Sequence, residues 1–462
     1  MRDNKDSLLS MVRDGGQLTT GQQVRLTMLL SFPSILAQIS SVMMQYIDAS
    51  MVGSLGANPS ASIGLVASST WLFGGFIMGA ASGFSVQIAH FCGSKDFRSA
   101  REVMRKGLVS LLCFGLLMGL SGLLISRSLP VWLGGSEEIN SDATGYFSIF
   151  SAFMPMMALS WSAGSMLQAS GNMKVPSILN VMMCVLDVIF NYIFIFGMDM
   201  GVRGAALGTG MAETVTAAAM LWFLLTRSKE LSVRGEHGNY VPDSKTLRNA
   251  FSISGPMWLQ NILMRGAYVA GTLIVSPLGP IAIAANAFAI TAESFCYMPG
   301  YGIEEAATTL VGQSLGAKRR FLAKQFARMT TFLAAGIMSV MAIAMFIGAG
   351  VLMSILSKDP EVVALGAKVL RIEAFAETMY GVSIVAYGAC VGAGNTLVPT
   401  ILNFSSMWIV RIGLAAILTP RMGLTGYWIA MCIELNVRGL LFVWWLRGDK
   451  WLRNRSITSE EK

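Results

Sequence analysis

The chain has 462 residues, of which 54% are hydrophobic and only 13% are charged, whereas soluble globular domains carry about 25% charged residues. This composition excludes an ordinary soluble protein and favours an all-α integral membrane protein. The net charge of +8 at pH 7 does not indicate a nucleic-acid partner, because the distribution of Lys and Arg over alternate loops accounts for it.

Twelve apolar stretches follow one another along the chain, each long enough to cross a hydrocarbon core of about 30 Å. In chain order they cover residues 25–52, 61–90, 107–129, 143–169, 176–197, 203–225, 250–275, 281–312, 329–356, 364–391, 399–418 and 424–446. We expect twelve transmembrane helices. Residues 1–20 are polar and show no signal peptide. The six cysteines form no C-x-x-C pair, so neither a disulfide framework nor a zinc site is predicted.

An internal repeat organises these stretches into two halves. Residues 171–180 read G-N-x-x-V-P-x-I-L-N, and residues 394–403, 223 positions later, read the same. The same offset aligns Ser31 and Pro33 with Ser254 and Pro256, Leu55-Gly56 with Leu278-Gly279, and Gly93 and Lys95 with Gly316 and Lys318. We therefore predict two homologous six-helix lobes, at residues 1–228 and 249–462, joined by a cytoplasmic linker at 229–248. Two such halves facing one another are typical of transporters.

The charges of the loops indicate the orientation. Most Lys and Arg residues lie at the termini and in one alternate set of loops, such as the loop that contains Lys95, Arg98 and Arg101. Positive residues accumulate on the cytoplasmic side of membrane proteins. We expect a multi-pass protein of the cell inner (plasma) membrane with both termini in the cytoplasm.

Ionisable residues inside the predicted spans are the candidates for function, because a charge in the membrane is costly. The first half contains Asp48, Asp187 and Glu213, with no Lys or Arg in its spans. The spans of the second half contain both acids and arginines: Glu293, Glu373, Glu377 and Glu434 with Arg265, Arg411 and Arg438. We expect these second-half charges to neutralise one another, with Glu434 and Arg438 paired at i,i+4 and Arg411 as the partner of Glu373 or Glu377. The first-half acids are left to bind a proton or a cation.

Four first-half residues are predicted to form the cation-coupling site: Asp48, Asp187, Asn191 and Thr209. A rise of 1.5 Å per residue places them at similar depths, roughly 8–15 Å below the outer surface. Their oxygen atoms suit a proton or a hard cation, so the site is also the candidate Na⁺ site. We favour H⁺, because two neighbouring acids tend to share one proton. The alternative is that Asn191 and Thr209 only join helices by hydrogen bonds.

Five residues are expected to line the substrate path: Tyr46, Met183, Arg265, Glu293 and Glu377. An aromatic ring stacks on organic cations, and methionine adapts to ligands of many shapes. The alternatives are that the methionines fill helix packing and that the aromatic residues form interfacial belts.

The chain resembles the multidrug and toxic compound extrusion (MATE) family over about residues 22–450. The similarity is carried by residues 47–53 (I-D-A-S-M-V-G), 171–176, 194–197 (F-I-F-G), 201–206 and 311–317. The resemblance implies a V-shaped pair of six-helix lobes and alternating access, with drugs and metabolites exported against inward H⁺ or Na⁺. It matches Asp48 to the family's first-helix cation-site aspartate and Thr209 to its sixth-helix threonine.

Two positions depart from the family pattern. Many members have Asn followed four residues later by Asp in the fifth helix, whereas this chain has Asp187 and then Asn191. Some members use a seventh-helix acid for sodium in the second lobe, but the seventh span here contains Arg265 and no acid. We therefore do not expect a second-lobe sodium site of that type.

The sequence thus predicts a monomeric secondary antiporter that exports cationic or amphipathic organic molecules across the lipid bilayer, with H⁺ or Na⁺ as coupling ion and no other cofactor. A flippase of a lipid-linked precursor is the alternative, which Arg265 and Arg411 leave open. A membrane-embedded transferase would need clustered polar catalytic residues, and none is found. The chain contains no P-loop, Rossmann fingerprint or nucleophile motif, so we do not expect an enzyme.

Overall fold

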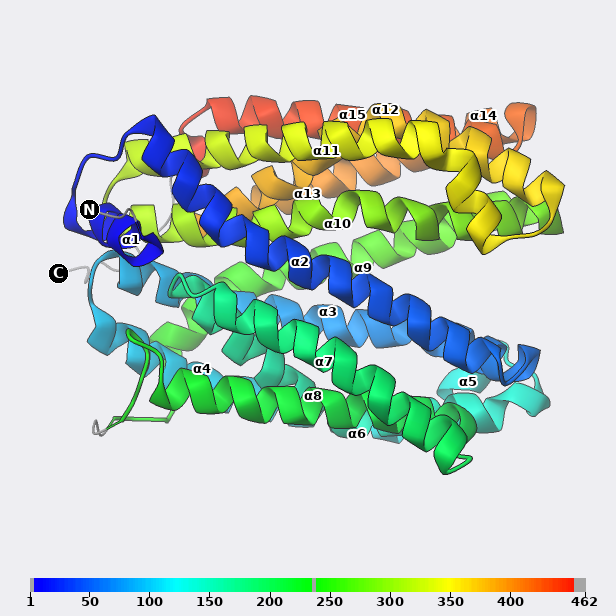
Figure 1. The fold of residues 1–462 in the computed structure, drawn as a ribbon, viewed down its shortest axis with the longest axis horizontal. Coiled ribbons are helices and arrows are strands. Elements are labelled where there is room, and N and C mark those ends of the chain that lie inside the picture. Colours follow the sequence, from blue (N-terminus) through cyan, green and yellow to red (C-terminus); the bar gives the residue numbers. More distant parts are fainter. Residues whose placement is uncertain (1–3, 235–237, 453–462) are drawn as a thin grey trace. The chain divides into compact units, whose positions relative to one another are not determined.

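The structure is a computed structural model that describes residues 4–234 and 238–452 (Figure 1). The described residues form helices and connecting turns, with no β-strand among them. In chain order the helices are α1 (Lys5–Asp14), α2 (Thr20–Gly53), α3 (Ala57–Gly93), α4 (Phe97–Ile125), α5 (Leu129–Trp132), α6 (Glu137–Ala169), α7 (Lys174–Tyr192), α8 (Gly201–Thr226), α9 (Ser244–Val275), α10 (Pro280–Gly316), α11 (Arg320–Leu356), α12 (Pro360–Gly392), α13 (Leu397–Ser405), α14 (Gly413–Met422) and α15 (Leu424–Arg447). The π-helical segment η1 (Ile193–Gly197) continues α7, and a second π-helical segment, η3 (Ser406–Ile412), connects α13 to α14. Short 3₁₀ turns lie at η2 (Ser276–Leu278) and η4 (Lys450–Leu452).

Each of the twelve predicted spans coincides with one long helical segment, which confirms the twelve-helix fold. Within the described residues, eleven of these segments are long and apolar enough to cross a membrane. The twelfth, α9, has 32 residues but is more polar, since it contains Gln260, Asn261 and Arg265. The third span was expected at 107–129, but α4 begins ten residues earlier, at Phe97. Asp96 fixes this start, because its side chain accepts a hydrogen bond of 3.0 Å from the backbone N–H of Ser99.

The repeat is visible in the positions at which helices begin. Five pairs of helices begin 223 residues apart: α3 and α10 at Ala57 and Pro280, α4 and α11 at Phe97 and Arg320, α6 and α12 at Glu137 and Pro360, α7 and α13 at Lys174 and Leu397, and α8 and α15 at Gly201 and Leu424. Backbone conformation recurs as well, since Lys95 and Lys318 both have positive φ, of 62° and 59°. The two halves therefore share one chain path.

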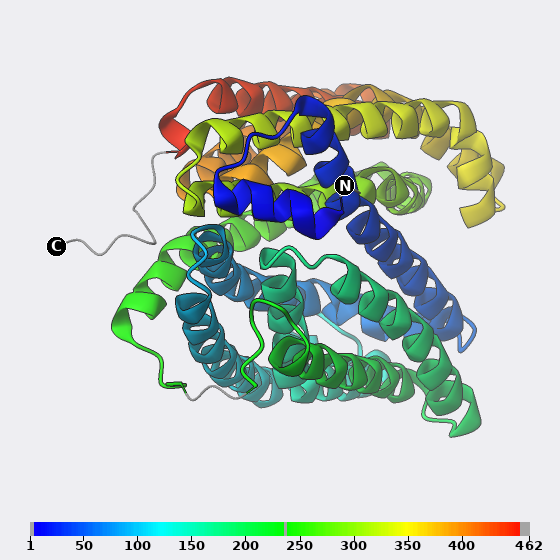
Figure 2. The same ribbon diagram turned by 60° about the vertical axis from the view of Figure 1, so that its left-hand side comes forward.

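The helices pack into two compact units. The N-unit consists mainly of residues 40–258, and the C-unit mainly of residues 15–39 and 259–452. In the N-unit, α6 packs against α3, α4 and α8, and in the C-unit its repeat equivalent α12 packs against α10, α11 and α15. Figures 1 and 2 show the helices of each unit lying side by side along their lengths. The two packing units divide the chain within α2, after residue 39, and within α9, after residue 258, and neither point lies in the expected linker at 229–248. The expected lobe boundary therefore stays a prediction.

Glycines at equivalent positions of the repeat allow close helix packing in both units. In the N-unit, a Cβ atom on Gly79 of α3 would lie 2.9 Å from the ring of Trp258 on α9. In the C-unit, a Cβ atom on Gly302 of α10 would lie 2.5 Å from the backbone nitrogen of Ile35 on α2. Gly302 and Ile35 are the repeat equivalents of Gly79 and Trp258. The first parts of α2 and α9 thus pack closely in equivalent places, which small residues permit in membrane helices.

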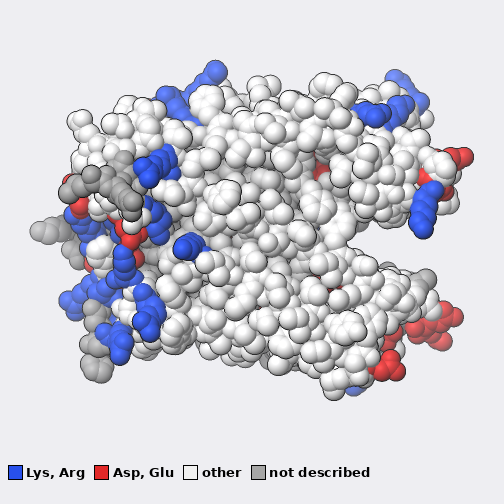
Figure 3. Space-filling view, in the orientation of Figure 1, with Lys and Arg blue, Asp and Glu red and all other residues white. Residues whose placement is uncertain are grey.

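The surface matches a membrane protein. Figure 3 shows uncharged side chains along the helices, with Lys and Arg gathered near helix ends. Exposed leucines such as Leu117, Leu120 and Leu124 on α4 suit contact with lipid.

Candidate cation-coupling site

Two acids of the N-unit meet at a single amide group. Asp48 lies on the last part of α2, and Asp187 and Asn191 lie one turn apart on α7. The Asn191 Nδ2 atom donates a hydrogen bond of 2.9 Å to Asp48 Oδ1 and another of 3.0 Å to Asp187 Oδ2. One amide nitrogen therefore holds the carboxyl groups of Asp48 and Asp187 close to each other. Two carboxylates held by one neutral donor repel each other, so the pair needs a shared proton or a bound cation to be stable.

The surroundings of these groups strengthen that requirement. Asp187 is 0% exposed and Asn191 1% exposed, whereas Asp48 is partly exposed. Neither acid forms an ion pair with Lys or Arg among the described residues. Asp187 Oδ1 and Asn191 Oδ1 are buried without a hydrogen-bond partner. A buried carboxylate that lacks a counter-charge either takes a proton or binds a cation, and the two unoccupied oxygen atoms can accept from either.

Helix α8 completes the arrangement. Thr209 lies on α8, which packs against α7. The neighbouring Gly208 makes room for the site, because a Cβ atom there would overlap with Asn191 Oδ1. One turn earlier on α8, a Cβ atom on Gly204 would lie 2.8 Å from the backbone of Phe194. The two glycines let α8 approach the α7–η1 segment closely and place Thr209 next to the residue that packs on Asn191.

The structure thus joins three of the residues predicted for coupling, Asp48, Asp187 and Asn191, by hydrogen bonds, and it places the fourth, Thr209, on the neighbouring helix α8. Tyr146 of α6 is within electrostatic reach of Asp48 and Asp187. Sequence reasoning missed Tyr146, since no motif or repeat position distinguishes it from other tyrosines in the spans. Among the residues expected to line the substrate path, Tyr46 is half-buried on α2 and Met183 lies one turn before Asp187 on α7.

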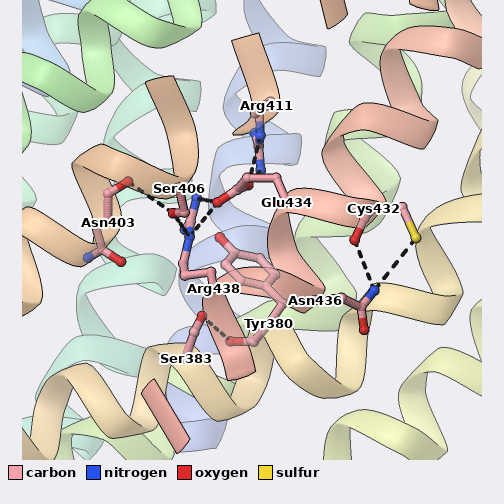
Figure 4. A network of polar contacts seen from close by, with 9 residues as sticks. All are labelled: Tyr380, Ser383, Asn403, Ser406, Arg411, Cys432, Glu434, Asn436 and Arg438. Carbon is pink, nitrogen blue, oxygen red and sulfur yellow. Dashed lines mark hydrogen bonds and ion pairs between the residues drawn. The ribbon is translucent and has the colours of Figure 1, made fainter. Parts of the chain in front are cut away.

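The C-unit contains a buried ion triad (Figure 4). Glu434 of α15 accepts hydrogen bonds from Arg411 Nε and Nη2 at 2.9 and 2.7 Å, and from Arg438 Nε at 2.7 Å. Arg438 also donates to the hydroxyl oxygen of Ser406, at 3.2 Å. The pairing of Glu434 with Arg438 is as predicted. Glu434 is 0% exposed, so each charge depends on the other two for compensation.

The predicted ion pair of Arg411 with Glu373 or Glu377 is wrong. We expected Arg411 to pair with one of them, but Arg411 is bound to Glu434. Both carboxyl oxygens of Glu373 and of Glu377 are buried without a hydrogen bond. The reason is that Arg411 lies on the π-helical segment η3, from which it reaches α15 instead of α12. These two acids are therefore not held by an ion pair.

The remaining charges of the C-unit are placed as follows. Glu293 of α10 is 5% exposed and lies in electrostatic contact with Arg411. Arg265 of α9 is half-buried, with its guanidinium group 6.0 Å from the ring centre of Tyr268. In the described part of the chain, no group of three or more His, Cys, Asp or Glu residues is arranged to hold a metal ion.

Comparison with protein families identifies the chain's relatives. The family model MatE matches residues 33–193 and 256–417, which together are well over half of the chain, and the two matches begin 223 residues apart. The chain is 23% identical to the probable multidrug resistance protein NorM of Thermotoga maritima over 93% of this chain and 94% of the relative. It is 27% identical to the NorM protein of Mannheimia succiniciproducens, over 94% and 96%, and 23% identical to the multidrug resistance protein MdtK of Yersinia pestis, over 94% and 96%.

Solved structures share the fold. The Vibrio cholerae MATE transporter VcmN in its bent form matches with a TM-score of 0.86 and 21% identity, over 94% of this chain and 98% of that one. A MOP superfamily transporter from Pyrococcus furiosus matches with a TM-score of 0.87 and 18% identity, over 95% and 97%. The relatives that we report are named for multidrug resistance, so they do not support the flippase alternative.

Proposed function

The chain belongs to the MatE family, and on that basis we propose that it is a multidrug efflux transporter that exports organic cations in exchange for protons. The observation that carries this proposal is the contact of Asn191 with both Asp48 and Asp187, which have no basic partner among the described residues. Two acids inside membrane helices are stable only when they gain positive charge. Such a site is suited to bind a cation that moves inward. The multidrug resistance names of the relatives support the substrate class.

The coupling step follows from the geometry. With one proton shared between Asp48 and Asp187, the pair carries a single negative charge, which Asn191 stabilises. Loss of that proton leaves two carboxylates that share one neutral donor and repel each other. The repulsion pushes α2 and α7 apart, so protonation changes the packing of the two helices that carry the site. Sodium at the same oxygens is the alternative coupling ion, with Asn191 Oδ1 and Thr209 as neutral ligands.

The membrane and the orientation complete the proposal. We place the protein in the inner membrane with both termini in the cytoplasm, as the loop charges indicate. In this orientation Asp48 lies towards the outer side and Gly201, the first residue of α8, near the outer surface. A protein that opens alternately to the two sides then takes up a proton outside and releases it inside.

Export from cells tests the transport function. A drug-sensitised bacterial strain that expresses the wild type should remove ethidium and survive higher concentrations of it, and Asp48→Asn should abolish both effects at equal protein level. Glu137→Gln changes an exposed acid of the same unit and should behave as the wild type. Full resistance in the Asp48→Asn strain would overturn the coupling role of Asp48.

A further inference from the structure

A third buried acid of the N-unit, Glu213, has no part in the coupling step described so far. It lies on α8 one turn beyond Thr209, so its side chain and that of Thr209 share a helix face about 6 Å apart along the axis. Glu213 is 4% exposed. Its Oε2 atom is buried without a hydrogen-bond partner, and no ion pair to Glu213 is present in the described residues.

The groups that face Glu213 come from the helices packed against α8. From α6, the polar side chains near it are those of Ser160 and Trp161. From α7, the ionisable group within electrostatic reach is Asp187. The η1 segment, which also packs on α8, has the sequence I-F-I-F-G and brings no charge. Within the described part of the chain, the charged neighbour of Glu213 is therefore the negative Asp187, with no Lys or Arg beside it.

A proton is the ligand that this environment favours. Two polar side chains are too few to solvate a carboxylate in a buried position, so the group is stable when it holds a proton. A metal ion is not favoured, because Asp48, Asp187 and Glu213 do not form a group that could hold one among the described residues. The charge on Asp187 adds to the preference for a neutral Glu213 whenever Asp187 is ionised.

We propose that Glu213 is the proton acceptor on the inward side of the Asp48–Asp187 pair and carries the coupling proton one step deeper into the membrane. Once Glu213 has released its own proton towards the inner side, the coupling proton leaves a carboxyl oxygen of Asp187, passes the hydroxyl group of Thr209, and forms a new O–H bond on Glu213. The negative charge moves in the opposite direction, from Glu213 to Asp187, so the net charge of the site is unchanged. This inference rests on the proposed function and adds an acid to the same site.

The direction of transfer follows from the order of residues along α8. The helix runs inward from Gly201 in the proposed orientation, and Thr209 and Glu213 follow one another at a spacing of one turn. Glu213 thus lies deeper than Thr209, and Thr209 lies next to Gly208, which packs directly on Asn191 of the coupling site. The repeat does not reproduce this arrangement, because the equivalents of Thr209 and Glu213 in α15 are Cys432 and Asn436.

Infrared spectroscopy of the purified protein tests the proposal without a substrate. A pH titration between about pH 5 and 9 should show carboxylic C=O bands that appear and vanish, including one that is absent in Glu213→Gln and shifted in Glu213→Asp. In Asp187→Asn, the midpoint of this band should move by at least half a pH unit, because the neighbouring charge is removed. Identical sets of titrating bands in the wild type and Glu213→Gln would overturn the proposal.

Transport distinguishes a proton carrier from a residue that only joins α6 to α8. In proteoliposomes, Glu213→Gln should change the pH profile of ethidium transport and lower the proton-driven rate at least tenfold, whereas Glu213→Asp should restore part of it. An unchanged pH profile and rate in Glu213→Gln would contradict the role of Glu213 while leaving coupling at Asp48 intact. If the wild type itself ignored the pH gradient, the proposed function would fail instead.

Discussion

Asn191 donates from one amide nitrogen to Asp48 at 2.9 Å and also to its helix neighbour Asp187 at 3.0 Å. The amide group thereby joins α2 to α7 through two acids. This contact is informative because a neutral donor cannot compensate two full charges. The site is complete only when a proton or a cation is added, and for that reason we assign coupling to this place in the N-unit.

Replacement of Asn191 by Leu should reduce transport strongly while the protein still folds. The change removes the donor to both acids, and a hydrogen bond to a charged group is worth about 1.5–3 kcal/mol. Ethidium efflux should therefore fall at least tenfold. Asn58→Leu, at an exposed position of α3, is the matched control and should retain activity. Equal efflux in both variants would show that Asn191 only fills space.

Addition of a methyl group at Gly208 should damage the same site from α8. A Cβ atom there overlaps with Asn191 Oδ1, so Gly208→Ala must displace the amide or the helix. We expect a loss of transport comparable to that of Asn191→Leu. Gly336→Ala is the control, because a Cβ atom on this glycine of α11 meets nothing within 4 Å. Thermal unfolding in detergent checks that both variants are folded, and normal transport by Gly208→Ala would contradict the close approach of α8.

The C-unit acids should differ in their effects on stability. Glu434→Gln leaves Arg411 and Arg438 without their shared carboxylate, and loss of one partner of a buried ion pair costs about 3–5 kcal/mol. Glu373→Gln removes a group whose oxygens have no hydrogen bond, so it should leave stability equal or improved. Thermal unfolding of the two variants is the measurement. A larger loss for Glu373→Gln than for Glu434→Gln would contradict the triad.

The stability contributed by the linker should depend on pH. Lys106 Nζ lies 2.7 Å from Asp243 Oδ1. Burial alone would raise the pKa of Asp243, but hydrogen bonds from Lys106 and Thr246 lower it to about 2. Because the pKa is lower in the folded state, the contribution is present above about pH 4 and is lost as the pH falls towards 2. Asp243→Asn should thus lower stability at pH 7 by less than about 1 kcal/mol, since the pair is partly exposed. The difference from the wild type should shrink at pH 3, and a constant difference would contradict the assignment.

The sequence predicted the helices well for physical reasons. A membrane span must be long and apolar, so each of the twelve spans was visible as one stretch, and the repeat doubled the evidence for helices such as α6 and α12. Asp48 and Asp187 stood out because a lone acid in such a stretch is costly. Their repeat equivalents are Gly271 and Val410, so the repeat alone does not locate the site.

The partners of Arg411 could not be predicted in the same way. Four acids lie in other spans of the second half, and the choice among them as partner of Arg411 depends on how each helix is rotated about its axis. The π-helical segment η3 changes that rotation at Arg411, and no residue pattern indicated it. Helix α1 was also not predicted, because its few apolar residues lie among polar ones and form no long apolar stretch. Three of its side chains, Leu8, Leu9 and Val12, are nevertheless buried.

The most direct test of proton coupling at Asp48 and Asp187 is ethidium transport in proteoliposomes under separately imposed gradients. A pH gradient at constant Na⁺ should drive transport by the wild type, a Na⁺ gradient at constant pH should not, and neither gradient should drive Asp48→Asn or Asp187→Asn. Transport driven by Na⁺ alone would assign sodium to the same oxygens. Proton-driven transport that persists in both Asp48→Asn and Asp187→Asn would contradict coupling at this pair.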